Sequence, residues 1–442
     1  MATPEATPEV TDAPALPDIQ GSDVAWVIMS SALVWLMIPG VGYFYSGMAR
    51  SKNALSLIML SVLSVAVVSV QWWIWGYSLA FGNGTAFIGN LDHAFFMGVD
   101  SSRSEVAPGL PGIVFALYQG MFAAITPALA IGSAAERGRI LPAIVFIFIW
   151  STIVYDPIAC WTWNPNGWSF KLGGLDFAGG TPVHISSGAA ALAYAIVVGK
   201  RHGHGTDTDE FKPHNIANIV LGTALLWFGW FGFNGGSALA ANGRAAMACA
   251  KFSALGFCSG AVAGLVSITP GSGFVGTPAA FAFGFFGALF CNIAVKLKHM
   301  FKYDDAADVF AVHCVGGIVG NLLTGIFAQQ SIAAADGSAP IPGGWLDHNW
   351  IQFGYQLADS VTGLSYSFIV TFVLLLIMDK IPGLSLRVDP ETEAKGLDEG
   401  EMGELAYYHV DRLVAINTRT GETKSIKEET IHQQNDTNVS IV

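Results

Sequence analysis

The sequence predicts an all-α polytopic membrane protein whose helices cross the bilayer many times. Of its 442 residues, 52% are hydrophobic and only 12% are charged, whereas soluble domains carry about 25% charged residues. Apolar runs that reach the roughly 20 residues needed by one bilayer-spanning helix recur along most of the chain. The 51 glycines and 13 tryptophans are typical of a helical bundle, where small residues permit close packing and tryptophans lie at the interfaces.

Ten apolar segments are expected to span the membrane between two polar tails. Residues 1–23 form a proline-rich tail without Lys or Arg, and residues 381–442 form a charged tail. The membrane domain is therefore expected at 24–380. The expected spans are 24–48, 54–82, 112–135, 139–163, 181–199, 215–241, 255–273, 277–297, 306–328 and 352–380.

Basic residues alternate between the loops as the positive-inside rule requires. The loops at 83–111 and 164–180 hold one basic residue each, and the loop at 329–351 holds none. The intervening loops are richer in Lys and Arg. This pattern predicts an extracellular N-terminus and a cytoplasmic C-terminal tail. The basic residues expected on the cytoplasmic side include Arg50, Lys52, Arg137, Arg139, Lys200, Arg201, Lys212, Lys296, Lys298 and Lys302.

The number of spans conflicts with this orientation. An extracellular start and a cytoplasmic end require an odd number of crossings, and ten is even. The conflict falls at residues 242–254, which end one outward span and begin another. Either everything after residue 255 is inverted, or 242–254 stretches across the bilayer, where extended unpaired backbone is not tolerated.

An internal repeat locates the same irregularity. Ala32-Leu-Val-Trp35 matches Ala224-Leu-Leu-Trp227, and Ile125-Thr-Pro127 matches Ile268-Thr-Pro270. In the first half, a full span and a long loop separate the motif at Trp35 from the motif at Ile125. In the second half, only a short link follows the motif at Trp227. The second half therefore lacks the equivalent of one helix. The expected units are repeat one at 24–200, repeat two at 213–328 and an extra helix at 352–380.

Each repeat also contains an Asp, a Val-His pair and a Gly at the same intervals. The copies span residues 176–188 and 305–317 and place histidines at 184 and 313. A lone buried histidine is more often a satisfied core residue. Two histidines at equivalent places in two repeats instead indicate a site on a pseudo-symmetry axis. We expect His184 and His313 to line a pore.

Several ordered motifs resemble the ammonium transporter (Amt/Mep/Rh) family, and the chain is most similar to the fungal ammonium permeases. The resemblance runs from about residue 24 to 408 and departs from the family between Met247 and Phe257, where the family's seventh helix is expected. The motifs are Pro39-Gly-Val-Gly-Tyr-Phe-Tyr-Ser-Gly47, Tyr118-Gln-Gly-Met-Phe-Ala-Ala-Ile-Thr126, Asp176-Phe-Ala-Gly-Gly180, Trp230-Phe-Gly-Phe-Asn-Gly-Gly-Ser237, Gly260-Ala-Val-Ala-Gly-Leu-Val266, Val312-His-Cys-Val-Gly-Gly317 and, in the tail, Gly396-Leu-Asp398 with Gly403-Glu404.

The resemblance implies eleven helices, built from two inverted five-helix repeats around a central pore plus one extra helix, in a homotrimer. About ten helices are expected here, the seventh being absent. It also implies that Phe122, Trp163 and Ser237 recruit ammonium at the outer side and that Phe122 and Phe233 gate the pore. From the sequence alone, aromatics at span ends are usually interfacial anchors. Asp176 is expected to be structural near the outer site, although a loop Asp is normally a solvated residue or a helix cap.

The expected function is transport of ammonium and methylammonium across the plasma membrane. No nucleotide loop, metal-ligand set or nucleophile triad appears, so neither enzymatic activity nor a cofactor or metal is expected, and no nucleic-acid partner. An ammonium sensor that signals through its tail, with a kinase or signalling partner and a phosphorylation site at Ser425, remains an alternative. A neutral gas or water channel is disfavoured by the aromatic outer site. A further alternative is a non-conducting variant, because one helix is missing.

Overall fold

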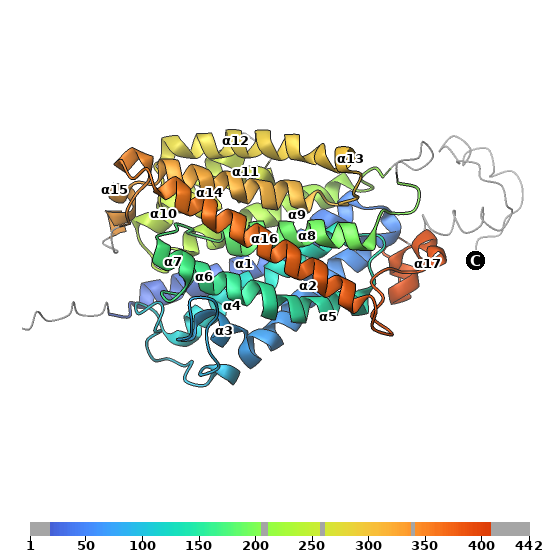
Figure 1. Ribbon diagram of the computed structural model, residues 1–442, viewed down its shortest axis with the longest axis horizontal. Coiled ribbons are helices and arrows are strands. Elements are labelled where there is room, and N and C mark those ends of the chain that lie inside the picture. Colours follow the sequence, from blue (N-terminus) through green and yellow to red (C-terminus); the bar gives the residue numbers. More distant parts are fainter. Residues whose placement is uncertain (1–17, 205–210, 257–260, 337–340, 408–442) are drawn as a thin grey trace, which may run out of the picture.

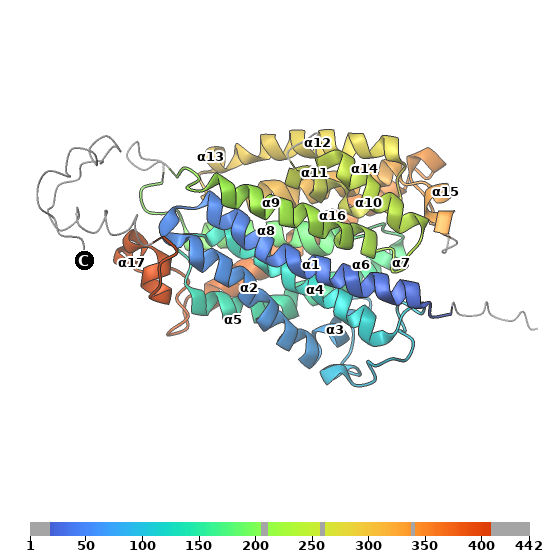
Figure 2. The same ribbon diagram turned by 180° about the vertical axis from the view of Figure 1, so that it is seen from behind.

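The computed structural model describes residues 18–204, 211–256, 261–336 and 341–407, which form an α-helical bundle. Figure 1 shows the helices side by side along one long axis, with α7 and α15 at one end and α13 and α17 at the other. Figure 2 shows the same arrangement from behind. Within the described ranges, the β pairing consists of three isolated bridges. The two ends are called the α15 end and the α17 end below.

The first half of the chain supplies eight helices. Long apolar stretches without formal charge favour helix here, because a helix satisfies its own backbone polar groups inside a membrane. These helices are α1 (Gly21–Met48), α2 (Ala54–Gln71), α3 (Tyr77–Phe81), α4 (Gly112–Ile131), α5 (Ile140–Trp150), α6 (Asp156–Trp163), α7 (Trp168–Leu172) and α8 (Ser186–Val198).

The second half supplies the remaining helices. At the start of α9, the Asn215 side chain accepts a hydrogen bond from the Asn218 N–H at 3.0 Å and so caps the helix. The helices are α9 (Ile216–Trp230), α10 (Gly243–Gly256), α11 (Ala261–Ile268), α12 (Thr277–Val295), α13 (Leu297–Phe301), α14 (Gly316–Phe327), α15 (Gln330–Ala333), α16 (Gln352–Met378) and α17 (Pro390–Lys395).

Nine helical segments in the described part of the chain are long and apolar enough to cross a membrane. They correspond to nine of the ten expected spans, and the expected span at 255–273 is the exception. The nine are Gly21–Met48, Ser51–Phe81, Gly112–Ala134, Ile140–Leu172, Gly180–Val198, Ile216–Gly235, Thr277–Phe301, Phe310–Phe327 and Gln352–Met378.

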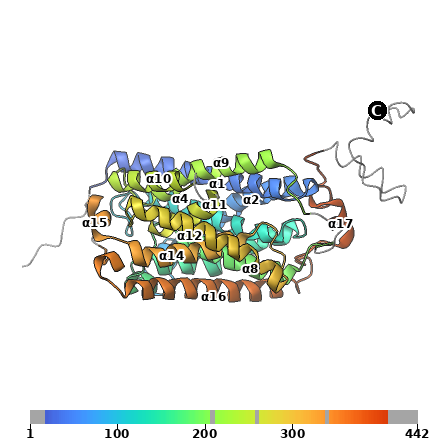
Figure 3. The same ribbon diagram turned by 90° about the horizontal axis from the view of Figure 1, so that it is seen from above.

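Helices α10 and α11 replace the expected link and span with a hairpin that begins and ends at the α15 end. The Arg244 Nε, at the start of α10, donates to the Gly273 carbonyl oxygen at 3.0 Å, just beyond α11. The Arg244 guanidinium also lies over the Phe274 ring, 5.1 Å from its centroid. Further along α10, the Lys251 Nζ donates to the Ser272 carbonyl oxygen at 3.2 Å. The start of α10 therefore lies beside the end of α11, in the half of the bundle nearer to α15 (Figure 3).

The hairpin removes the conflict between crossing number and loop charge. Helix α10 has 14 residues and is about 21 Å long at 1.5 Å per residue, which is short of a roughly 30 Å hydrocarbon core. Because it turns back, nine full crossings remain among the described segments, an odd number. The expectation that 242–254 is stretched or that the second half is inverted is wrong. A helix keeps the backbone of this segment hydrogen-bonded, which an extended chain in lipid cannot do.

A buried ion-pair cluster joins four connecting loops at the α17 end. The Arg201 guanidinium donates to Asp304 through its Nε and Nη2 atoms, both at 2.9 Å, and to Glu136 through Nη1 at 3.1 Å. Glu136 also pairs with Arg50. Burial alone would raise the pKa of Asp304, but the hydrogen bond and charge of Arg201 outweigh burial and hold that pKa well below its usual range. The cluster therefore fixes the loops after α1, α4, α8 and α13 together.

The hairpin predicts a labelling pattern for single cysteines. Ala241→Cys and Thr277→Cys, both at exposed positions flanking the hairpin, should react with an impermeant maleimide from the same side of the membrane. Lys296→Cys, at the far end of α12, should react only from the opposite side. The unsubstituted chain controls for its native cysteines. Labelling of Ala241→Cys and Thr277→Cys from opposite sides would show that the segment between them crosses.

Asp304→Asn should destabilise the protein by about 3–5 kcal/mol at neutral pH, because it removes one partner of a buried ion pair. The folded-state pKa of Asp304 is lowered, so its stabilising contribution is present above about pH 4, the unfolded value, and is lost as the pH falls further. Thermal unfolding is measured in detergent from pH 7 downward. The unfolding temperature of the unsubstituted chain should fall toward that of the variant only in acid. A constant difference between the two proteins across this range would contradict the assignment.

Candidate functional site

The two repeat-related histidines meet in the centre of the bundle. The Nδ1 atoms of His184 and His313 lie 3.2 Å apart, and the two ring centroids are 5.3 Å apart. His184 is 1% exposed and His313 is 6% exposed. The Nε2 atom of His184 is buried and has no hydrogen-bond partner among the described residues. The pair therefore shares one hydrogen bond, and a buried ring nitrogen remains available to a ligand.

Each histidine lies on a six-residue π-helical turn that begins near a buried aspartate. His184 lies in η6 (Gly180–Ile185) and His313 in η9 (Phe310–Val315). Asp176 accepts hydrogen bonds from the backbone N–H groups of residues 179, 180 and 181 at 2.7–2.8 Å, and Asp305 accepts from the N–H of Phe310 at 2.8 Å. Burial raises the pKa of both carboxyl groups to about 6. The aspartates therefore cap the segments that carry the histidines.

Two glycines let the histidine segments approach closely. A Cβ atom on Gly188 would lie 2.3 Å from the backbone nitrogen of Cys314, the residue after His313. A Cβ atom on Gly317 would lie 2.9 Å from the Gly180 carbonyl oxygen and 3.2 Å from the Cβ of His184. Each glycine follows its own histidine by four residues and contacts the opposite histidine segment. The repeated spacing in the sequence thus reflects a reciprocal contact between the two halves.

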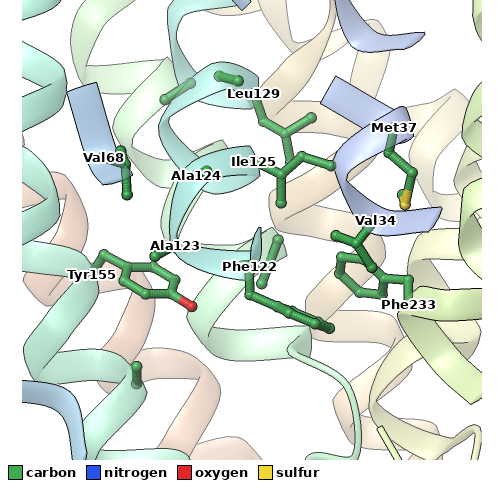
Figure 4. Close-up of a cluster of buried hydrophobic side chains, with 14 of the residues drawn as sticks. Val34, Met37, Val68, Phe122, Ala123, Ala124, Ile125, Leu129, Tyr155 and Phe233 are labelled. Atoms are coloured by element: carbon green, nitrogen blue, oxygen red, sulfur yellow. The ribbon is translucent and has the colours of Figure 1, made fainter. Parts of the chain in front are cut away.

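A stack of aromatic rings lies on the α15 side of the histidines. Phe122 from α4 and Phe233 from η7 (Phe231–Gly235) have ring centroids 4.4 Å apart. Figure 4 shows these two side chains next to each other, with Ile125 and Leu129 further along α4. The rings of Phe233 and Trp230 both stack on His184, each at 5.8 Å between centroids. Phe122 and Phe233 are fully buried, so a passing molecule requires these rings to move.

The predicted outer residues gather around Phe122. The Trp163 ring meets Phe122 edge-to-face at 5.8 Å, and its indole Nε1 donates to the Asp176 carbonyl oxygen at 3.0 Å. The Ser237 hydroxyl donates to the Phe233 carbonyl oxygen at 2.8 Å. Since that proton is already engaged, the oxygen presents its lone pairs as an acceptor. The structure thus brings Phe122, Trp163, Phe233 and Ser237 together, with Asp176 behind them.

Sequence reasoning did not assign roles to two residues of this site. The Tyr118 hydroxyl donates to the Gly232 carbonyl oxygen at 2.8 Å and lies 3.2 Å from the Ser237 Oγ, so it joins α4 to η7. The Trp230 Nε1 donates to the Thr269 Oγ1 at 3.2 Å, which holds the ring against His184. Both residues begin motifs noted in the sequence, which was the available signal. Ser425 lies outside the described residues.

An apolar cavity of about 150 Å³ extends from the histidine pair toward the α17 end. His184 and His313 form part of its wall, and α1 and α9 contribute Tyr45 and Leu226. Asp308 lies on its wall near the α17 end. Trp230 and Phe233 also line the cavity, so the aromatic stack and the histidine pair both border the same apolar space.

Comparison with known proteins identifies the family. The model of the Ammonium Transporter Family matches residues 25–251 and 246–407. The chain belongs to the ammonium transporter family. It is 55% identical to Ammonium transporter 1 of Schizosaccharomyces pombe, with 88% of this chain and 83% of the relative covered. It is 46% identical to Ammonium transporter MEP2 of Saccharomyces cerevisiae, with 87% and 83% covered. The crystal structure of Candida albicans Mep2 superposes with a TM-score of 0.80 at 45% identity and covers 85% of this chain and 88% of that chain.

The same comparison shows that this transporter chain is short by about one helix. The alignment with the S. pombe protein is 413 positions long but includes 88% of the 442 residues, about 389, so about 24 positions have no counterpart here. A bilayer-spanning helix needs roughly 20 residues. The two matching stretches meet at 246–251, within α10. This position agrees with the departure expected between Met247 and Phe257, and it explains why α10 and α11 form a short hairpin.

The contact at Gly188 yields a test of the histidine pairing. Gly188→Ala should destabilise the protein by about 1–3 kcal/mol, because the added methyl group overpacks the crossing at Cys314. Gly354→Ala in α16 is the matched control, since a Cβ there meets only Ile351 at 3.8 Å, and it should be neutral or stabilising by up to about 1 kcal/mol. Thermal unfolding of the two variants measures this difference. Equal behaviour would mean that the halves do not approach closely at Gly188.

Proposed function

We propose that this protein transports ammonium, which enters at the α15 end and passes the two histidines as ammonia. The observation that carries the proposal is the buried His184–His313 pair, whose free ring nitrogen lies between a closed aromatic stack and an apolar cavity. Intramembrane ionisable groups are costly and are usually functional. Neutral imidazoles can both donate to and accept from a small amine. Membership in the ammonium transporter family supports the same substrate.

Recruitment is proposed at the outer aromatic residues. A cation within about 6 Å of an aromatic face gains about 0.5–2 kcal/mol per ring, and Phe122 and Trp163 provide two such rings. The Ser237 oxygen can accept one hydrogen bond from ammonium, as its own proton is engaged at Phe233. Na⁺ and K⁺ have no N–H groups of their own to donate to that oxygen. The site therefore favours ammonium and methylammonium.

We propose that the substrate loses a proton to the water at the α15 end before it passes the rings of Phe122 and Phe233. The segment beyond those rings is apolar. Moving an unpaired charge into such a region costs far more free energy than its interaction with two aromatic rings provides. Neutral ammonia carries no such cost. It can exchange hydrogen bonds with His184 and His313 before it enters the cavity toward the α17 end.

Orientation and assembly follow from charge and family. We propose that the α17 end faces the cytoplasm of a plasma-membrane homotrimer, because the basic loop residues gather at this end. The tail segment that follows the last span is docked there. The Asp398 carboxylate accepts hydrogen bonds from the N–H groups of Leu55 and Ser56, at 2.9 and 2.8 Å, at the start of α2. A docked tail is compatible with a regulatory partner, which we keep as a secondary proposal.

Uptake of methylammonium by transporter-deficient yeast tests this function. Trp163→Ala should raise the concentration for half-maximal uptake about 2- to 30-fold. This range corresponds to the free energy of one lost cation–aromatic contact. Trp350→Ala is the matched control, because Trp350 also lies near the α15 end but is 64% exposed and outside the site. Phe122→Ala and His184→Ala should lower uptake. Unchanged uptake by Phe122→Ala and His184→Ala would refute the proposed path.

The same assay separates the site from the shortened hairpin. Each variant is compared in this chain and in a form with one apolar helix restored after Met247. We expect slower uptake by this chain, because the α17 half of its proposed pore lacks the helix that would close it on one side. Uptake by the restored form alone would mark this chain as a non-conducting variant. Absence of uptake from both forms, with normal amounts of protein, would contradict transport.

A further inference from the structure

The short hairpin leaves the bundle unfilled beside the pore at its α17 half. Helices α10 and α11 pack between α9 and α12, whereas α9 and α12 form no substantial interface with each other. Both α9 and α12 continue toward the α17 end, and the hairpin does not. No helix among the described residues therefore separates α9 from α12 in this half. The apolar cavity beneath the histidines lies at this position.

The wall of the cavity is apolar and reaches the outer surface of the bundle. Phe44 and Met48 of α1, Val262 of α11, Val295 of α12 and Val312 of η9 contribute to the lining. All five are partly exposed rather than buried. An apolar cavity of about 150 Å³ does not hold water well, and at this depth the surrounding medium is hydrocarbon. The space therefore suits a hydrocarbon chain better than water.

Basic residues lie where the cavity approaches the α17 end. Lys298 is 2.6 Å from Asp308, the acidic residue of the cavity wall, and neutralises it. Lys296, the residue after Val295, and Lys302 are exposed, and neither has an ion-pair partner within the described part of the chain. Lysines at a membrane surface attract anionic lipid headgroups. The positive charge at the cavity entrance thus matches the anionic headgroup of a phospholipid, and the apolar lining of the cavity matches its acyl chain.

We propose that this cavity binds an acyl chain of an anionic phospholipid, which enters between α9 and α12 from the leaflet at the α17 end. The phosphate lies near Lys296 and Lys302, and the chain extends along Val295 toward His313. Bound there, the lipid completes the wall that the short hairpin leaves open. This inference concerns the bundle itself and does not depend on the transported species.

Photolabelling of the full chain in vesicles tests the proposal. The protein is reconstituted in phosphatidylcholine that contains a phosphatidylserine with a diazirine at the end of one acyl chain, and adducts are mapped by mass spectrometry. Adducts on cavity residues such as Met48, Val295 and Val312 are expected. Adducts confined to outward residues such as Phe290 and Ile293, which are 45% and 50% exposed, would overturn the proposal. In a companion experiment a photoreactive amino acid is placed at position 295. A link from that position to a second copy of the chain would also overturn the proposal, because it would show protein in the opening.

Two sets of variants sharpen the result. Val295→Trp fills the cavity and should reduce adducts on Met48, whereas Ile293→Trp, on the outward side of the same helix, should not. Lys296→Gln with Lys302→Gln should weaken labelling by the serine lipid about fivefold for each lysine that contacts it. It should leave a phosphatidylcholine probe unchanged. Equal labelling by the serine and choline probes in the unsubstituted chain would overturn the anionic headgroup, and this comparison needs no variant to fold.

Discussion

Backbone hydrogen bonding in hydrocarbon is the constraint on which this architecture depends. Each N–H and C=O group at membrane depth must find a partner within the protein, so a segment too short to cross cannot remain extended. Residues 243–256 and 261–268 meet this requirement as two short helices of opposite direction. Arg244 and Lys251 donate to carbonyl oxygens at residues 273 and 272 and tie the two arms together. As a result, the helices that follow keep the orientation needed to bring His313 beside His184.

The site depends on two closely crossing segments as much as on its histidines. Gly188 and Gly317 leave no room for a Cβ, so the halves approach until the imidazoles share a hydrogen bond. The aspartates at 176 and 305 cap the π-helical turns that aim those rings into the pore. Such turns are rare and are often found at functional sites. The aromatic stack covers the histidine pair on one side.

The loss of about one helix falls unevenly on the molecule. The recruitment residues and the aromatic stack lie in the α15 half, which the hairpin still covers through the contacts of Arg244 with Phe177 and Phe274. The α17 half keeps its loops together through the buried cluster of Glu136, Arg201 and Asp304. The missing part is the helical segment that would line the cavity between these two regions. The outer aromatic residues and the loop cluster are therefore preserved, and the shortened hairpin affects the wall of the cavity that we propose to bind lipid.

The sequence by itself determined the helical membrane fold, nine of the spans and the residues of the site, because those depend on local apolar length and on motifs that repeat at fixed intervals. His184, His313 and the two aspartates could be paired from spacing alone, and the resemblance supplied Phe122, Trp163, Phe233 and Ser237. Only the tertiary structure decided how residues 242–273 are accommodated, because that depends on which neighbours can bond to a shortened segment. It also decided the roles of Tyr118 and Trp230, whose partners at residues 232 and 269 lie far away in the sequence. The Tyr118 contact joins the two halves, and the Trp230 contact forms once segments within the second half have packed.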